Sequence, residues 1–208
     1  EKATAKFQEM RLDFDEVTTL GTPRRTALLV KNLAETQQGA SSEYKGPSTA
    51  IAFDKDGNPT KAAIGFARGK KVDVADLVVK DGYVYAVSSE EGKQTVELLP
   101  TLLKELVEGL NFPKNMRWGD LDFRFVRPLR WLVALYDEEV IDFTVANVKS
   151  GRVSRGHRFL SEGDFTINKA SDYEQACKDA FIIVDQEKRR DIIKAQIEEI
   201  AKAQLEGA

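Results

Sequence analysis

Hydrophobic residues recur at different spacings along this chain, and each spacing predicts a different element. From residue 97 to 110, leucine and valine recur every three or four positions, which predicts an amphipathic helix with Pro100 in its first turn. From residue 121 to 125, apolar residues alternate with charged ones, which predicts a strand that turns its aromatic rings into the core. The apolar run 129–135 and the segment 140–148 predict two further strands.

The first third of the chain predicts strands and helices of modest length. Residues 2–12 carry apolar positions at helical spacing, and the segments 16–19 and 25–31 are expected to form strands joined by a turn. The polar run 34–47 is rich in Gln, Ser, Glu and Gly, which is typical of a loop. A short helix is predicted over residues 61–68, where a glycine follows at the position that ends helices.

The clearest local signal is the Asp-Gly dipeptide at 81–82. It supplies the two positive-φ positions of a type I′ turn, so a β-hairpin is predicted over residues 78–88. Near the end of the chain, residues 172–180 and the segment from residue 186 onward predict helices, with a buried strand at 181–184 between them.

Together these elements predict an α+β fold, with a mostly antiparallel sheet and peripheral helices. Residues 1–165 are expected to form the core of one domain, and residues 166–208 a helix–strand–helix extension of it. Because the sequence starts at Glu1 rather than at a methionine, we expect it to be a fragment of a longer polypeptide.

Composition excludes several classes of protein. The 208 residues carry a net charge of −3, so any binding of nucleic acid must come from a local basic patch. One cysteine, Cys177, and one histidine, His157, build neither a disulfide framework nor a Cys/His zinc site. No apolar run approaches the roughly 20 residues that span a bilayer. A soluble protein of the reducing cytoplasm, with no membrane contact, is expected.

Two segments gather the basic residues of this acidic chain. Residues 111–130 interleave arginines with aromatic rings, and residues 149–158 hold four cations and no acid, with Gly151 and Gly156 allowing close approach of the backbone to a ligand. Exposed arginines suit phosphate oxygens because the planar guanidinium donates two parallel hydrogen bonds. The alternative is that the arginines pair with neighbouring acids on a solvated sheet face.

The sequence segments that resemble catalytic or metal-binding motifs do not have the residue spacing that those motifs require. The segment 54–60 resembles a calcium loop but places its glycine at the fourth rather than the sixth position, and the glycines near Lys70 miss the spacing of a phosphate-binding loop. His157 has no orienting carboxylate or nucleophile nearby in the sequence, so a structural or phosphate-contacting role is favoured. We therefore expect no catalytic residue and no metal ligand in this chain.

Six short sequence motifs, found in a fixed order, identify the family that the chain resembles. It is similar to the N-terminal third of the beta subunit of the bacterial, two-subunit-type glycyl-tRNA synthetase, and the resemblance covers nearly the whole chain. One departure is Asn115, where a serine is more common. The six motifs are LGTPRR at 20–25, KGP at 45–47, GFAR at 65–68, FPKNMRWG at 112–119, FVRPLRWLVAL at 125–135 and RGHRF at 155–159.

The resemblance implies an α₂β₂ aminoacyl-tRNA synthetase of bacterial protein biosynthesis. In that family the alpha subunit carries the active site for glycine and ATP, and the beta subunit supplies tRNA binding, so no cofactor is expected in this fragment. The fold would resemble the editing-type domain of the phenylalanyl-tRNA synthetase beta subunit. An editing activity is not expected, because glycine has no smaller competitor that a second sieve must remove.

The expected function is a non-catalytic fragment that binds or positions tRNA(Gly) for aminoacylation by the alpha subunit of the glycine–tRNA ligase. The expected partners are that alpha subunit, tRNA(Gly) and a second beta subunit of the tetramer. The alternatives are a structural, subunit-interaction module without direct tRNA contact and, less favoured, a deacylase. Trp131 is assigned to the core. The candidate tRNA-contacting residues are Arg117, Trp118, Arg124, Arg127, Arg130, Arg152, Arg155, His157 and Arg158, with Arg24 and Arg25 in second rank.

Overall fold

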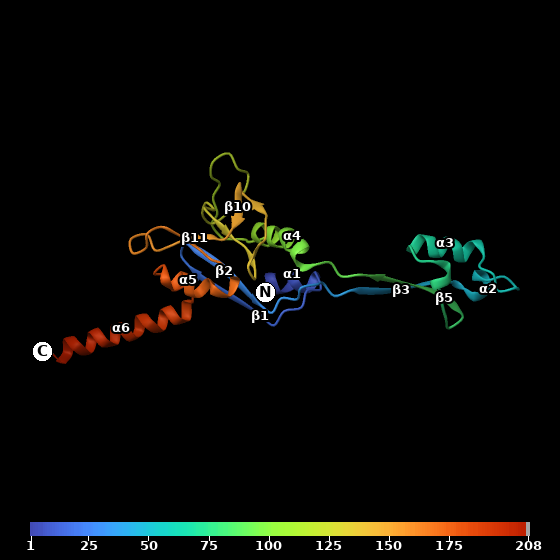
Figure 1. The fold of residues 1–208 in the computed structure, drawn as a ribbon, viewed down its shortest axis with the longest axis horizontal. Coiled ribbons are helices and arrows are strands. Elements are labelled where there is room, and N and C mark those ends of the chain that lie inside the picture. The colour runs from blue at the N-terminus through green and yellow to red at the C-terminus, as the bar shows by residue number, and fades with distance from the viewer. Residues whose placement is uncertain (207–208) are drawn as a thin grey trace. The chain divides into compact units, whose positions relative to one another are not determined.

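The computed structural model describes residues 1–206, with side chains described to residue 204 (Figure 1). Contacts divide the chain into two compact units. Unit 1 comprises Glu1–Glu35 and Gln94–Ala208, and unit 2 comprises Thr36–Lys93. Helices and small, mostly antiparallel sheets make up both units, so the predicted α+β class is confirmed. The predicted division near residue 165 and the likeness to an editing domain stay predictions.

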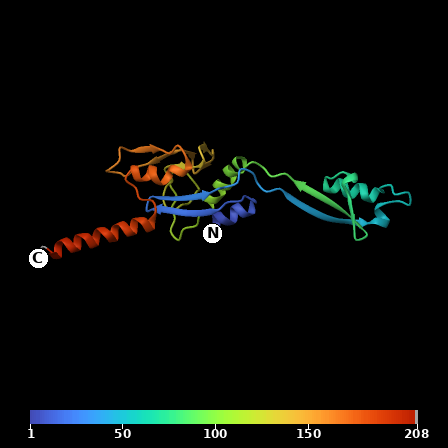
Figure 2. The ribbon, with the colours of Figure 1, turned by 60° about the horizontal axis from the view of Figure 1, so that its bottom comes forward.

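Unit 1 is built on a β-hairpin with helices and short strands around it (Figure 2). Strands β1 and β2 pair along their whole length, from Glu16 opposite Lys31 to Thr22 opposite Arg25. Strand β10 pairs in parallel with β6 and antiparallel with β9, whereas β7 pairs with β8 and β11 with β12. The elements are α1 (Lys2–Glu9), β1 (Glu16–Thr22), β2 (Arg25–Lys31), α4 (Thr95–Glu108), β6 (Leu132–Val133), β7 (Leu135–Tyr136), β8 (Glu139–Val140), β9 (Thr144–Val145), β10 (Val148–Gly151), β11 (Val153–Arg155), β12 (Asp164–Thr166), α5 (Tyr173–Asp179) and α6 (Gln186–Glu206).

Two hydrophobic clusters form the core of unit 1. In the larger one, Phe7 of α1 and Leu102 of α4 are almost fully buried against Val145 of β9. In the smaller one, Leu20 of β1 packs with Cys177 of α5. Burial of a large apolar side chain stabilises a fold by about 1.5–3 kcal/mol, so these clusters hold the helices against the strands.

Unit 2 is a three-stranded antiparallel sheet with helices on one face. The sheet order is β3-β5-β4, and Ala52, Ala63 and Val84 form a small core between sheet and helices. The predicted type I′ turn is confirmed, because Asp81 and Gly82 have φ of 52° and 76°. The elements are β3 (Ala40–Ser48), α2 (Thr49–Ala52), α3 (Lys61–Lys70), β4 (Val78–Lys80) and β5 (Tyr83–Glu90).

The prediction of a strand at residues 121–125 is wrong. The segment between α4 and β6 has no regular strand, and only an isolated bridge joins Met116 to Phe125. Its aromatic rings pack on one another instead, with Phe123 stacked on Phe125 at 5.9 Å between ring centroids. Local ring packing therefore replaces a sheet partner, and these rings are half-buried rather than enclosed.

Several other predictions about where elements lie are corrected by the structure. The polar run 34–47 contains most of β3, which pairs with β5 across more than 30 residues of sequence. Pro100 lies in the second turn of α4, because the helix begins at Thr95. The segment 140–148 is interrupted at residues 141–143 and by a turn at 146–147, and residues 181–184 form no strand although they contribute buried side chains.

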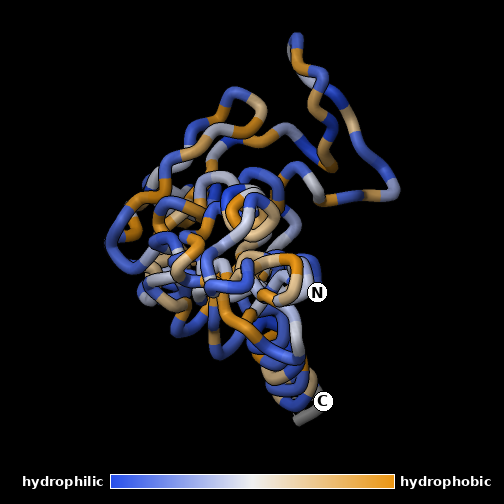
Figure 3. The backbone as a smooth tube through the Cα atoms, turned by 90° about the vertical axis from the view of Figure 1, so that its right-hand side faces the viewer, coloured by the Kyte–Doolittle hydropathy of each residue, from blue (hydrophilic) through white to orange (hydrophobic). Residues whose placement is uncertain are grey.

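The C-terminal helix α6 leaves much of its apolar face uncovered. Ile193, Ile197 and Ile200 are each at least half exposed, and Figure 3 shows hydrophobic and hydrophilic positions interspersed along this helix. Arg189 joins the start of α6 to β1, because its Nη1 donates to the carbonyl oxygens of Gly21 and Ile183 at 3.1 and 2.6 Å. Among the helices described, none is long and apolar enough to cross a membrane.

We expect Ser150→Ala to destabilise unit 1 by about 1–3 kcal/mol, because it leaves buried backbone groups unpaired. Ser150 is 6% exposed, and its Oγ donates to the carbonyl of Ile141 at 2.6 Å and accepts from the amide of Phe143 at 2.9 Å. Urea denaturation measures the free energy of unfolding. The control Thr144→Ala, at an exposed position of the neighbouring strand, should change the free energy of unfolding by less than about 0.5 kcal/mol. An equal effect of both variants would contradict the stabilising role of the Ser150 hydrogen bonds.

We expect Asp185→Ala to fray the first turn of α6, and Asp185→Asn, which keeps an acceptor oxygen but loses the charge, to fray it less. Oδ1 of Asp185 accepts from the amides of Glu187 and Lys188 at 2.9 and 3.1 Å, and these bonds hold the pKa of its carboxyl below the ordinary value. A lowered folded pKa means that the carboxylate stabilises the fold above the unfolded pKa. That contribution is lost as the pH falls through the folded pKa.

Hydrogen exchange at the amides of Glu187 and Lys188 measures this capping directly. At neutral pH the Ala variant should exchange these amides several-fold faster than the parent chain. On acidification the difference in exchange rate between the Ala variant and the parent chain should narrow once the carboxyl of Asp185 is protonated, after correction for intrinsic exchange. A difference in exchange rate that does not change with pH would show that the charge of the carboxylate does not contribute to capping.

Candidate nucleic-acid interface

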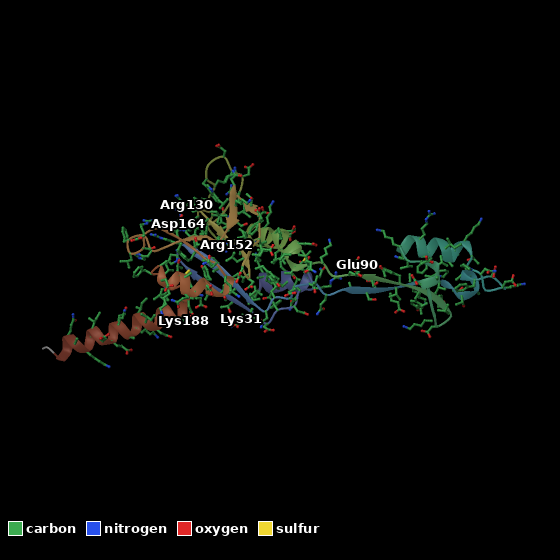
Figure 4. All side chains as sticks on the ribbon, in the orientation of Figure 1. Lys31, Glu90, Arg130, Arg152, Asp164 and Lys188 are labelled. Atoms are coloured by element: carbon green, nitrogen blue, oxygen red, sulfur yellow. The ribbon has the colours of Figure 1, made fainter. Side chains whose placement is uncertain are left out.

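A shallow cavity of about 230 Å³ in unit 1 collects several of the predicted basic residues. We call it the Trp131 cavity. Its walls come from the residues that lead into β6, from β10 and from the β11–β12 hairpin, and Figure 4 shows Arg130, Arg152 and Asp164 on the same side of this unit. The lining residues are Arg130, Trp131, Leu132, Val148, Lys149, Gly151, Arg152, Val153, Arg155 and Asp164.

Two arginines lie against the indole ring of Trp131. The guanidinium carbons of Arg25 and Arg155 are 5.7 and 5.8 Å from its ring centroid, within the range of a cation–π attraction. Nη2 of Arg25 also donates to the carbonyl oxygen of Arg155 at 2.8 Å. The ring is half-buried, so Trp131 forms a wall of the cavity rather than part of an enclosed core.

Arg25 is held in the protein interior rather than on a free surface. Its Nε and Nη1 are buried without a hydrogen-bond partner among the described residues. Burial raises the pKa of the Tyr173 hydroxyl and of the Cys177 thiol, and the positive charge of Arg25 opposes part of that rise. Tyr173 and Cys177 therefore keep their protons at neutral pH, and Arg25 lies next to Trp131, whose ring lines the cavity.

The other cations of the cavity differ in whether they already make hydrogen bonds or ion pairs within the protein. Arg152 donates to the carbonyl oxygens of Asn168 and Glu138 at 3.2 and 2.8 Å, so it joins the bend after β12 to the turn between β7 and β8. Arg155 pairs with Asp164 at 3.3 Å.

Lys149 pairs with Asp142 at 2.8 Å. Arg130 is exposed and makes no hydrogen bond or ion pair with the residues that the structure describes. The alternative of arginines paired with acids thus holds for Arg155, but not for Arg130.

The loop between β11 and β12 is shaped by His157. Its Nδ1 accepts from the amides of Phe159 and Leu160 at 3.3 and 3.2 Å, and its own amide donates to the carbonyl of Ala180 at 2.9 Å. These bonds make His157 a turn-forming residue. The loop carries Arg158 outward together with two apolar side chains, because Phe159 is 84% and Leu160 is 60% exposed.

The segment 111–128 holds the remaining candidates, outside the cavity. Arg117 pairs with Asp122 at 3.3 Å, and Nη1 of Arg124 donates to Oδ1 of Asn115 at 3.4 Å. Trp118 packs edge-on against Phe123 at 5.8 Å between ring centroids and is half-buried. Arg127 is exposed, and no side-chain bond ties it to the described part of the chain.

The structure brings Arg130, Arg152 and Arg155 together and adds Arg25 behind Trp131. Arg24 stays apart from the cavity lining, exposed in the turn between β1 and β2. Sequence reasoning missed Trp131 as a wall of the cavity, because a long apolar run predicts a core residue. It also missed Asp164, whose role follows only from the register that places Arg155 opposite it.

In the described part of the chain, no cluster of three or more His, Cys, Asp or Glu residues has the arrangement needed to hold a metal ion. The Trp131 cavity offers positively charged side chains and one indole ring. It can attract an anion, donate charged hydrogen bonds to oxygen, and pack a planar group near an indole ring.

Comparison with known proteins gives a consistent result. The family described as glycyl-tRNA synthetase beta subunit matches residues 1–208. The chain is 44% identical to the glycine–tRNA ligase beta subunit of Desulforamulus reducens, covering 98% of this chain and 30% of that protein. It is 48% identical to the corresponding protein of Desulfitobacterium hafniense strain Y51, covering 97% of this chain and 30% of that protein.

A third relative, the glycine–tRNA ligase beta subunit of Citrifermentans bemidjiense, is 47% identical over 95% of this chain and 29% of its own length. The chain thus spans about 30% of the length of the curated relatives that it matches. Because the family match extends from the first residue to the last, this chain belongs to the glycyl-tRNA synthetase beta subunit family.

Proposed function

We propose that the protein to which this chain belongs acts as the beta subunit of a glycine–tRNA ligase, in an α₂β₂ complex with an alpha subunit that uses ATP and glycine. Within it, this segment contacts the phosphate backbone of tRNA(Gly) and carries no active site. The support is the membership of the family and the names of its relatives, which act on glycine and tRNA.

The observation that carries the tRNA contact is the convergence on the Trp131 cavity. Arg130, Lys149, Arg152 and Arg155 line one cavity, and Asp164 is the only acid among its lining residues. The hydrogen bonds of Arg152 go to uncharged carbonyl oxygens, so its positive charge is not neutralised there. A polyanion near this surface would meet a field that favours it, although the chain as a whole is acidic.

The candidate residues fall into two groups by what they already bind. Arg130, Arg158 and Arg127 are exposed and uncommitted among the described residues, so they can turn to a phosphate without breaking a bond of the fold. Arg152 and Arg25 hold backbone segments together and act as positioning residues. Removing a positioning arginine would disturb the fold as well as the charge, which makes it a poor probe of tRNA contact.

A second candidate function is supported by the loop between β11 and β12. Phe159 and Leu160 are the most exposed large apolar side chains of that hairpin, at 84% and 60%. Exposed apolar side chains at a loop tip are typical of a protein contact. In this alternative the segment docks on the alpha subunit or on later parts of the beta subunit, without touching tRNA.

We expect the double variant Arg130→Ala and Arg158→Ala to weaken tRNA binding by the full α₂β₂ enzyme about tenfold or more at low salt. Each phosphate contact that is lost should also flatten the dependence of log affinity on log salt concentration by roughly 0.7–0.9. Filter binding or fluorescence anisotropy over a salt series measures both quantities.

Two controls separate contact from general charge. Arg130→Lys with Arg158→Lys keeps the charge and should keep most of the salt dependence. Lys194→Ala removes one charge from an exposed position of α6 and should leave affinity and slope unchanged. If the double alanine variant matched the parent enzyme in both, this surface would not contact tRNA.

We expect the double variant Phe159→Ser and Leu160→Ser to separate the two candidate functions. If the hairpin docks on protein, sedimentation velocity should show loss of the α₂β₂ species at concentrations where the parent complex stays intact, with tRNA affinity per intact tetramer unchanged. If it instead lies along tRNA, assembly should be normal and only tRNA binding should weaken.

A further inference from the structure

One face of the unit 2 sheet is uncovered by the rest of that unit. Val84 and Ala86 of β5 are fully buried, and Val84 packs with the core that α2 and α3 cover. Side chains alternate along a strand, so Tyr83, Tyr85 and Val87 point to the opposite face. They remain partly exposed there, with Tyr83 38% and Val87 39% exposed.

The register of the sheet places basic residues beside these two tyrosines. Lys45 of β3 lies opposite Tyr85, and Lys80 of β4 lies opposite Tyr83. Residues directly opposite each other in antiparallel strands share a face. The uncovered face therefore carries the two tyrosine rings at its centre and one lysine on each side, and we call it the tyrosine face.

Contacts on the tyrosine face confirm this placement. Nζ of Lys45 lies 3.6 Å from the ring centroid of Tyr83, and Nζ of Lys80 lies 5.9 Å from that of Tyr85. Lys80 also reaches Glu43 at 3.6 Å, with both side chains about half exposed. Exposed ion pairs are worth little, so these lysines can exchange their present contacts for others at small cost.

We propose that the tyrosine face binds unpaired nucleotides of tRNA, stacking bases on Tyr83 and Tyr85 while Lys45 and Lys80 pair with the flanking phosphates. This inference rests on the proposed function, since it takes tRNA as the ligand. A sheet face that presents aromatic rings between cations suits a single strand, in which planar bases alternate with charged phosphates. A purely apolar protein surface would leave both lysines without partners.

The two rings are suited to successive bases of one strand. Positions 83 and 85 are two residues apart on β5, so their Cα atoms are separated by about 7 Å along the strand direction. Lys45 lies over the ring of Tyr83, and the pair of Lys80 with Glu43 crosses β5, so these exposed side chains must swing aside as the bases stack. Double-stranded RNA keeps its bases inside the helix, so it offers the tyrosine face nothing to stack on.

The test uses the full α₂β₂ enzyme carrying Tyr83→Ala and Tyr85→Ala, with Tyr83→Phe and Tyr85→Phe as the matched control. Loss of stacking should weaken tRNA binding at least tenfold, with an unchanged salt slope, whereas the phenylalanine variant should bind as the parent does. Affinity for a blunt RNA duplex should be the same in all three. Chemical probing should show that the alanine variant alone exposes unpaired tRNA nucleotides protected in the parent complex.

Other outcomes overturn the inference. If the alanine variant binds tRNA as the parent does, while Arg130→Ala with Arg158→Ala weakens binding, the tyrosine face is not a nucleotide site and the proposed function stands. If both pairs leave tRNA binding intact, both proposals fail. If the alanine variant loses the tetramer but binds tRNA normally once assembled, the face docks on protein.

Discussion

Arg25 holds together two hairpins of unit 1 that lie far apart in the sequence. Its guanidinium lies against Trp131 and donates to the backbone of Arg155, which is 130 residues away. This contact joins the β1–β2 hairpin to the β11–β12 hairpin, next to Trp131 and Arg155 of the cavity lining. A buried guanidinium that lacks partners for two of its nitrogens is costly. The attraction to the indole ring and the bond to the carbonyl offset part of that cost.

The same geometry explains why a cluster of arginines is not a uniform binding surface. A guanidinium that bridges backbone carbonyls, as in Arg152, fixes the distance between two segments and keeps its charge. One that reaches only solvent, as in Arg130, is free to reorient. A fixed guanidinium contributes positive potential to the surface, and an exposed one can reorient towards an anion without breaking a bond of the fold.

Local signals predicted the β1–β2 and β4–β5 hairpins and α4, because turn chemistry and helical spacing act within a few residues, but they did not predict the β11–β12 hairpin. The β2 bounds and the turn at Asp81 and Gly82 agree with the sequence. Prediction failed where distant partners decide. The polar run that contains most of β3 is a strand because β5 pairs with it. The segment 121–125 departs from its prediction for a local reason, since its rings pack on each other. The cavity could not be predicted, since Trp131 and Arg25 meet only in the folded chain.

Chain entry into and exit from unit 2 occur at neighbouring backbone positions. In unit 1 the amide of Thr95 donates to the carbonyl of Glu35 at 2.8 Å, and in unit 2 the amide of Gln37 donates to the carbonyl of Lys93 at 2.8 Å. Unit 2 is therefore an insertion in the topological sense, and unit 1 closes on itself without it. In evolutionary terms, such a module can be gained, lost or exchanged at a single junction, while its host retains its hydrophobic core.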